Sequence, residues 1–266
     1  MNPSRIAQWP RSWRFAQWPG NPRVRGVFTS REGGTSEGPY GCAEGGGMNL
    51  GDHVGDDAQA VQRNRRLLAE WLAGVQPAWL QQVHGTEVAA LDDWRAGQSP
   101  RADAAVSLRA GVAASVLVAD CLPVLLAAPR GSGVAAAHAG WRGLAGGVLE
   151  RAAAALARGA ACRGEDLQAW LGPAIGPRHF EVGDEVRAAF VAIDAGAGVA
   201  FVPGARQGKW MADLFELAHM RLQAAGVPRE SIYGGGLCTF SDPASYYSFR
   251  RDRITGRQAG LVWLAG

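Results

Sequence analysis

Long apolar runs in the middle of the chain predict its buried strands. Residues 112–128 are almost continuously apolar and are interrupted only by Asp120-Cys121 and Pro123. Such a run is typical of strands buried on both faces, and its interruption predicts two strands with a break between them. Residues 133–137 form a shorter apolar run and predict another buried strand.

Apolar residues at helical spacing predict helices on either side of these runs. The first helix follows the capping pair Asp56-Asp57, extends to residue 73 and is stopped by Gly74. Others are predicted over residues 144–158, 181–193 and 211–225. Further strands are predicted at residues 24–30, 102–107, 167–171, 232–239 and 257–264, with a strand pair over 83–91 that turns at His84-Gly85.

The order of these elements decides the fold class. Strands and helices mix without a strict alternation, no G-x-G-x-x-G follows a strand, and the chain has no P-loop, which disfavours a dinucleotide or nucleoside-triphosphate fold. The pattern predicts an α+β fold (mixed α/β), in which mixed β-sheets pack together and are flanked by helices.

Two N-terminal segments depart from this pattern. Residues 7–10 recur as residues 16–19, and four residues cannot form a structural repeat, so we expect residues 1–15 to be a flexible extension and residues 16–266 to form a single catalytic domain. Residues 31–55 are rich in glycine and include Arg31 and Asn49. A loop this long is uncommon in compact domains unless it is functional, so we expect it to contact a ligand.

Composition excludes several classes of protein. The net charge of +3 over 266 residues, without a basic run interleaved with aromatics, argues against a nucleic-acid partner. No apolar run approaches the roughly 20 residues of a membrane span. The 4 cysteines are scattered and form no CxxC pair, which disfavours a secreted disulfide framework. A cytoplasmic protein without a membrane partner is the expectation.

Three metal-capable side chains each stand at the end of an apolar segment. His84 closes residues 79–83, Cys121 closes residues 115–120, and His138 closes residues 134–137. If these ends converge, they form a His/Cys/His site with an open position, which suits Zn²⁺ and a water molecule whose pKa falls toward 7. Asp120, beside Cys121, would then orient an imidazole or act as a base.

The same residues support two other chemistries. Cys121 as a nucleophile, with His138 or His84 as its base, would make a cysteine hydrolase. Two histidines and a cysteine with a weak axial ligand, such as Met48, are the ligand set of a blue-copper site, which makes Cu²⁺ the alternative metal. The chain has only 5 histidines, too few for a trinuclear copper cluster and a blue site together.

Several motifs resemble the YfiH/laccase-domain family, which is also described as multicopper polyphenol oxidase-like and as purine nucleoside phosphorylase. They occur in the family's order from about Trp18 to Leu264: Thr29-Ser30-Arg31-Glu32-Gly33-Gly34, Asn49-Leu50-Gly51-Asp52-His53-Val54-Gly55-Asp56-Asp57, Gln82-Val83-His84-Gly85, Asp120-Cys121-Leu122-Pro123-Val124, His138-Ala139-Gly140-Trp141-Arg142-Gly143, Gly172-Pro173-Ala174-Ile175-Gly176-Pro177 and Thr255-Gly256-Arg257-Gln258-Ala259-Gly260. The resemblance implies a fold similar to that of deamidating toxins and the Zn²⁺ ligands His84, Cys121 and His138.

The resemblance also implies an activity. It points to zinc-dependent phosphorolysis of adenosine, inosine, guanosine and methylthioadenosine, together with adenosine deamination, so that purine nucleosides and phosphate are the expected partners. A cysteine-type hydrolase (amidase) acting on peptidoglycan precursors, or a copper-dependent polyphenol oxidase, is the alternative.

Other site residues are assigned on the same hypothesis. Arg31 and Asn49 are predicted to contact phosphate or ribose and to take part in catalysis, Asp120 to transfer a proton, and Arg142 to bind an anion. Residues 41–47 are longer than the family's usual connection at this point, and we expect them to extend a loop at the mouth of the pocket.

Overall fold

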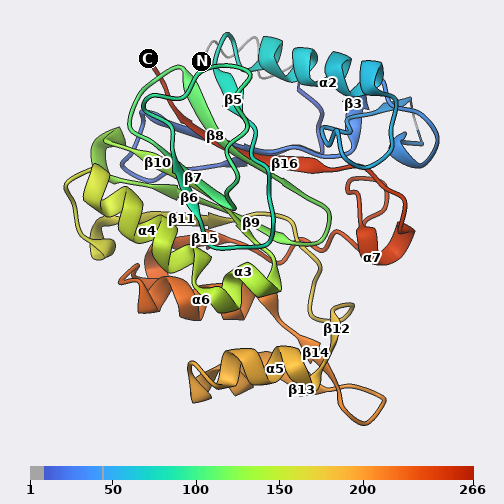
Figure 1. Ribbon diagram of the computed structural model, residues 1–266, viewed down its shortest axis with the longest axis vertical. Coiled ribbons are helices and arrows are strands. Elements are labelled where there is room, and N and C mark those ends of the chain that lie inside the picture. Colours follow the sequence, from blue (N-terminus) through green and yellow to red (C-terminus); the bar gives the residue numbers. More distant parts are fainter. Residues whose placement is uncertain (1–8, 44) are drawn as a thin grey trace.

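The fold is built around two packed β-sheets. A computed structural model describes residues 9–43 and 45–266, and within them it places five strands in one sheet and six in the other (Figure 1). The first sheet has the order β1 (Arg14–Ala16), β2 (Val24–Phe28), β16 (Gln258–Leu264), β8 (Val112–Val118) and β5 (Gln76–Ala78). The second has the order β15 (Ile232–Gly234), β11 (Gln168–Leu171), β9 (Leu122–Ala127), β10 (Val134–Ala139), β7 (Ala104–Ser107) and β6 (Val88–Ala90).

The apolar run at residues 112–128 connects the two sheets. Its two halves form β8 and β9, as predicted, but β8 pairs with β16 in the first sheet while β9 pairs with β10 and β11 in the second. The change of sheet occurs at Asp120, which lies in a bend and has a positive φ of 90°. Side chains of β8, β9, β10 and β16 fill the space between the two sheets. Every residue of β8 and β9 is buried, so both faces of these two strands are covered.

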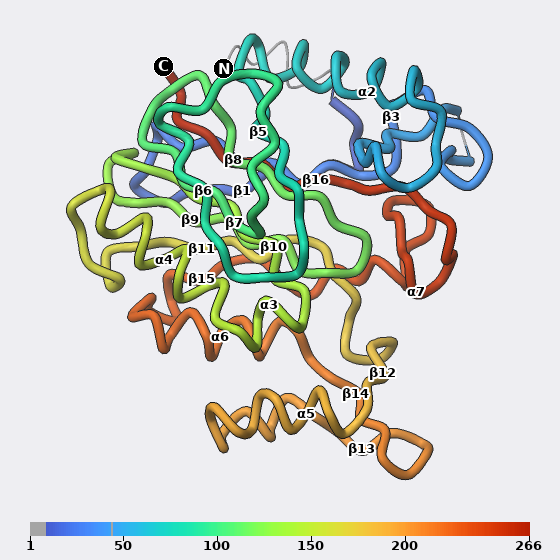
Figure 2. Tube along the Cα trace, viewed as in Figure 1, coloured from blue at the N-terminus to red at the C-terminus, as the bar shows by residue number. Residues whose placement is uncertain are grey.

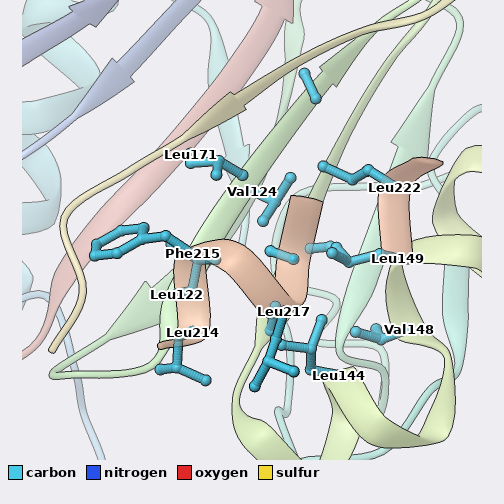
Figure 3. Close-up of a cluster of buried hydrophobic side chains, with 14 of the residues drawn as sticks. Leu122, Val124, Leu144, Val148, Leu149, Leu171, Leu214, Phe215, Leu217 and Leu222 are labelled. Carbon is cyan, nitrogen blue, oxygen red and sulfur yellow. The ribbon is translucent and has the colours of Figure 1, made fainter. Parts of the chain in front are cut away.

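Helices cover the outer faces of both sheets (Figure 1). The first helix, α2 (Ala58–Trp71), lies against the five-stranded sheet, and Asp57 caps it as predicted by accepting hydrogen bonds from the backbone N–H groups of Gln59 and Ala60. On the opposite side, α3 (Trp141–Gly146), α4 (Val148–Gly159) and α6 (Leu214–Ala224) pack with the six-stranded sheet. Figure 3 shows the leucines and valines of β9, α3, α4 and α6 that form this apolar layer.

A small unit lies beyond α6. It contains β12 (Glu181–Gly183), β13 (Phe201–Pro203) and β14 (Lys209–Ala212) in a three-stranded sheet beside α5 (Asp184–Val191). Figure 2 shows the chain leaving the six-stranded sheet after β11, forming this unit and returning into α6. The remaining elements are β3 (Glu32–Gly34), β4 (Gly46–Gly47), α7 (Phe249–Asp252) and the 3₁₀ helices Gly38–Tyr40, Pro129–Gly131, Gly164–Asp166, Ala195–Ala200 and Arg229–Ser231.

The mixed arrangement confirms the α+β fold class, but several element boundaries differ from those predicted. The helix expected over 144–158 is broken into α3 and α4 at Gly147, whose φ of 96° no other residue adopts easily. The helices expected from residues 181 and 211 are each preceded by a strand, because β12 and β14 pair with each other. The strand expected over 232–239 ends at Gly234, the first of three consecutive glycines with positive φ.

The strand pair expected over 83–91 is also wrong. Only the strand β6 forms. The backbone N–H groups of His84 and Gly85 donate hydrogen bonds to the carboxylate of Asp103 instead of to a neighbouring strand. In the described part of the chain, no helix combines the length and apolar character that crossing a membrane requires.

The N-terminal segment differs from the expected extension over residues 1–15. Residues 1–8 lie outside the described part, but the chain from Trp9 onward packs into the fold. Trp9 and Trp13 are buried in the apolar cluster that the five-stranded sheet forms with α2. Trp13 meets Trp71 of α2 edge to face, with 4.9 Å between the ring centroids. β1 then pairs with β2, so the predicted boundary at residue 15 falls inside a strand. The burial of two indoles explains this difference, since about 150–250 Å² of aromatic surface is withdrawn from water for each.

Candidate metal centre

His84, Cys121 and His138 converge at one edge of the packed sheets. His84 lies in the turn before β6, Cys121 immediately precedes β9, and His138 belongs to β10. Their ligand atoms all lie within 4.8 Å of one another, and Cys121 Sγ is 3.8 Å from His84 Nε2. The two imidazoles meet edge to face with 4.7 Å between their centroids. The predicted convergence of the three side chains is therefore present.

A buried aspartate that the sequence analysis did not single out holds the two histidines. Asp103 is fully buried, and its Oδ1 accepts hydrogen bonds from His138 Nδ1 at 2.8 Å and from the backbone N–H of His84 at 2.9 Å. Its Oδ2 accepts from the N–H groups of Val83 at 3.1 Å and Gly85 at 2.7 Å. One carboxylate thus positions the His84 turn and fixes the ring of His138 with Nε2 directed away from it.

Gly140 makes room for the cluster. A Cβ atom on this residue would lie 2.9 Å from Cδ2 of His84 and 3.0 Å from Sγ of Cys121, closer than real Cβ contacts come. Gly140 has φ −64°, so its backbone does not require glycine, and the need is for space alone. The glycine that follows His138 in the motif is therefore explained by the approach of two of the three metal-capable side chains.

The charges of the cluster favour metal binding. Burial alone would raise the pKa of the Cys121 thiol, but the imidazoles of His138 and His84 outweigh this effect and lower that pKa to about 6. Burial alone would lower the pKa of His138, whereas the Cys121 sulfur and the Asp103 carboxylate raise it to about 9. At neutral pH these values describe a thiolate paired with a protonated His138. A zinc or copper ion bound here would take the place of that proton, which leaves the thiolate and neutral imidazoles that such ions prefer.

The geometry fits one ion. With bonds of about 2.0–2.3 Å, tetrahedral ligand atoms lie roughly 3.3–3.8 Å apart, so the observed separations need only a small contraction. Three protein ligands leave one position of a tetrahedral ion open to the adjoining space. The residues therefore form a site able to bind a metal ion.

That space is a cavity of about 730 Å³ with the three ligands in its wall. Trp79 and Phe249 provide aromatic surface, and Arg65 and Arg257 provide positive charge. A cavity of roughly 300–1,000 Å³ with apolar walls and a few polar groups is typical of sites for small organic molecules.

Arg31 and Asn49 are not among the described residues that line this cavity. The guanidinium of Arg31 donates hydrogen bonds to the carbonyls of Gly41 and Pro243 and lies over the ring of Tyr247. Arg31 thus anchors the loop that begins at Gly41. The described residues of the 41–47 loop are likewise absent from the cavity wall, so the expectation that they extend its mouth is not met.

Asp120 and Arg142 also make contacts elsewhere. The carboxylate of Asp120 accepts hydrogen bonds from Thr239 Oγ1 at 2.7 Å and from the backbone N–H of Arg250 at 2.6 Å. The guanidinium of Arg142 stacks on Trp141, 4.3 Å from its ring centroid. Neither residue is among those described in the cavity wall. Their roles in proton transfer and anion binding stay predictions.

Fold and site together define a mixed α+β protein with a His/Cys/His cluster that could bind a metal ion, in a ligand-sized cavity. Residues 25–265 match the model of the family described as multi-copper polyphenol oxidoreductase laccase, and the chain belongs to this family.

Relatives match over nearly their whole length. A Pseudomonas aeruginosa protein named purine nucleoside phosphorylase is 51% identical over 95% of this chain and 98% of its own. The Escherichia coli protein named purine nucleoside phosphorylase YfiH is 46% identical over 93% of this chain and 97% of its own. The resemblance to the YfiH family is thereby confirmed.

Solved structures share the fold. A Neisseria meningitidis protein superposes with a TM-score of 0.88 at 42% identity, covering 96% of this chain and 100% of its own. YlmD from Geobacillus stearothermophilus superposes with a TM-score of 0.84 at 32% identity, over 96% and 97% of the two chains.

Proposed function

We propose that this protein is a zinc-dependent purine nucleoside phosphorylase that also deaminates adenosine. The observation that carries the proposal is the His84–Cys121–His138 cluster in the wall of a cavity that also presents aromatic and cationic side chains. The names of relatives that are 46–51% identical over 93–95% of the chain support the choice of substrate. The products would be a free purine base and ribose 1-phosphate.

Phosphorolysis exchanges one bond at C1′ of the ribose for another, and residues of the cavity can assist this exchange. A phosphate oxygen forms a bond to C1′ of the ribose while the bond from C1′ to the purine nitrogen breaks, and the departing base takes up a proton. Trp79 and Phe249 offer flat apolar surface to the purine and exclude water, and the arginines attract the anionic co-substrate. Bound zinc would supply Lewis acidity and lower the pKa of a water in its open position.

Deamination of adenosine is the second proposed activity of this site. Nucleobase deaminases of the zinc-dependent kind use one histidine and two cysteines, or three cysteines, with an open position for water. The cluster here has the same number of protein ligands and a mixed nitrogen and sulfur donor set. Release of ammonia from adenosine without phosphate would reveal this activity separately from phosphorolysis.

The test combines metal analysis with turnover. We expect stoichiometric zinc in the isolated protein, phosphate-dependent release of hypoxanthine from inosine, and loss of both after chelation. Cys121→Ser should abolish activity, whereas Cys162→Ser, at a thiol beyond the end of α4, should not. A metal-free protein that hydrolyses an amide through Cys121 would instead identify a cysteine hydrolase, and bound copper with phenol oxidation would identify a polyphenol oxidase.

A further inference from the structure

The Asn49-Leu50-Gly51 turn makes contacts that the metal centre does not explain. Asn49 is fully buried, and its Oδ1 accepts hydrogen bonds from the N–H groups of Gly51 at 3.0 Å and Arg257 at 2.8 Å. The N–H of Leu50 donates to the carbonyl of Arg257 at 3.0 Å. The turn therefore binds both the backbone N–H and the backbone carbonyl of Arg257. A buried amide with this many partners fixes position rather than contacting a ligand.

The same turn also binds a second arginine. Nε of Arg65, on α2, donates to the carbonyl of Leu50 at 3.0 Å. The guanidinium of Arg65 lies over Trp79, 4.7 Å from the ring centroid, and pairs with Asp52 at 3.2 Å. These contacts fix the direction in which the guanidinium enters the cavity.

The side chain of Arg257 is held but not saturated. Its Nη1 donates to the carbonyls of Thr255 at 3.1 Å and Gly256 at 3.0 Å, while Nε and Nη2 donate to no acceptor in the described part of the chain. Arg257 lines the same cavity as His84, Cys121 and His138. Burial lowers the pKa of Arg257, and the negative charges of Cys121 and Asp120 act in the opposite direction. The nitrogens Nε and Nη2 are therefore available to an anion in the cavity that holds the candidate metal centre.

Gly51 leaves space for the side chain of Arg257. A Cβ atom there would lie 2.8 Å from Cγ of Arg257 and 3.2 Å from its Cβ. The backbone of Gly51 is not among those with positive φ, so an alanine could adopt it, and only the arginine would have to move. The glycine therefore sets the path of the Arg257 side chain.

We propose that Arg257 and Arg65 bind inorganic phosphate as the co-substrate and that the Asn49–Gly51 turn positions them. The inference rests on the proposed phosphorylase function and names its anion subsite. Guanidinium groups bind phosphate through paired, charge-assisted hydrogen bonds and keep their charge at every working pH. They would hold the nucleophilic phosphate oxygen as its bond to C1′ forms and the bond to the base breaks.

Steady-state kinetics on the zinc-loaded protein tests the subsite. We expect Arg257→Ala to raise KM for phosphate by at least about tenfold, because charge-assisted hydrogen bonds are lost, with KM for inosine changed less than about twofold. Arg257→Lys should recover part of the loss, since a point charge replaces a bidentate fork. Arg163→Ala, at an exposed arginine paired with Glu165, is the matched control and should leave both KM values unchanged.

Gly51→Ala provides a variant that keeps the charge. It should raise KM for phosphate through displacement of Arg257, while Gly198→Ala, whose Cβ would meet only Arg187 at 3.8 Å, should not. If Arg257→Ala does not fold, Gly51→Ala and Arg257→Lys decide the question. Unchanged KM for phosphate in the folded variants of an active enzyme overturns the subsite.

Direct binding separates failure of the subsite from failure of the proposed function. Inorganic phosphate should raise the unfolding temperature of the wild-type protein above that in chloride of equal ionic strength, by mass action on the folded state. This shift should vanish in Arg257→Ala and persist in Arg163→Ala. A wild-type protein that shows the shift but no phosphorolysis refutes the proposed function and keeps the anion site, whereas a shift retained in Arg257→Ala refutes the site.

Discussion

Replacing Asp103 by asparagine tests whether one carboxylate organises the metal centre. Asparagine has the same shape but one acceptor oxygen, and Asp103 accepts four N–H hydrogen bonds through two oxygens. If the amide NH₂ takes the place of Oδ2, it faces the N–H groups of Val83 and Gly85. If it takes the place of Oδ1, it faces the N–H of His84 and Nδ1 of His138. In either orientation the amide NH₂ of the asparagine faces buried N–H groups, and these donors are left without an acceptor.

The second orientation has a further consequence for the metal. His138 could relieve the conflict by accepting at Nδ1, but its proton would then move to Nε2 and occupy the lone pair that a metal ion needs. The loss of one or two buried hydrogen bonds to a charged acceptor costs about 1–6 kcal/mol, at about 1–3 kcal/mol for each unsatisfied group. Loss of a partner that orients a metal ligand weakens metal binding by about 10–100-fold.

Two measurements check these magnitudes. Urea unfolding of the metal-free Asp103→Asn protein should give a free energy of unfolding lower by about 1–6 kcal/mol than the wild type. Competition with a chelating dye should show zinc affinity reduced by about 10–100-fold. Asp92→Asn is the control, because this carboxylate accepts a single exposed hydrogen bond from the N–H of Leu108. Wild-type zinc affinity in Asp103→Asn would refute the assigned role of the carboxylate.

Three further predictions follow from contacts around the cluster and beneath the first sheet. Gly140→Ala should reduce zinc affinity at least about tenfold, because its Cβ would press on His84 and Cys121, and undiminished binding in the dye competition would contradict this. After chelation at pH 7, Cys121 should be alkylated before the other three cysteines, since its pKa of about 6 makes it a thiolate, and zinc should protect it. Peptide mass mapping measures both rates, and equal rates with and without zinc would exclude Cys121 as a ligand. Trp13→Ala should lower the free energy of unfolding by about 3–5 kcal/mol in urea, and a loss below about 1 kcal/mol would show that the N-terminal segment is not part of the core.

The metal ligands could be predicted because their signal is local. His84, Cys121 and His138 each interrupt or end an apolar stretch of the sequence. Cys121 and His138 lie on the neighbouring buried strands β9 and β10 or directly before them, whereas residues 79–83 before His84 form no strand and Val83 is exposed. Asp103 gives no comparable signal. It lies 35 positions from His138, and it is one of 24 acidic residues in the chain. Its importance comes from complete burial beside a turn whose N–H groups have no strand partner, which only the tertiary structure reveals.

The cavity arginines gave no such local signal. Glycine density predicts that Arg31 and Asn49 contact phosphate, and neither is among the described residues of the cavity wall, so that role stays a prediction. Arg65 reads as an ordinary polar position of α2, and it reaches the cavity only because α2 lies over the Asn49–Gly51 turn. Arg257 reaches it because β16, which begins at the next residue, is fixed in register between β2 and β8. Both positions depend on pairings between residues far apart in sequence.

Asn49 and Asp103 therefore have the same kind of role, because each holds residues that line one cavity. Each is a completely buried polar side chain whose hydrogen bonds join segments distant in sequence, and each leaves the chemistry to the residues it holds. A buried polar group without partners costs about 1–3 kcal/mol, so such groups persist where every bond is made and the geometry they impose is rigid. Rigid placement of two imidazoles and a guanidinium in the wall of one cavity is what attack of phosphate on a bound nucleoside requires, because a displacement of about 1 Å can cost about 100-fold in rate. By this argument Asn49→Ala should raise KM for phosphate and leave zinc affinity intact, whereas Asp103→Asn should lower zinc affinity first.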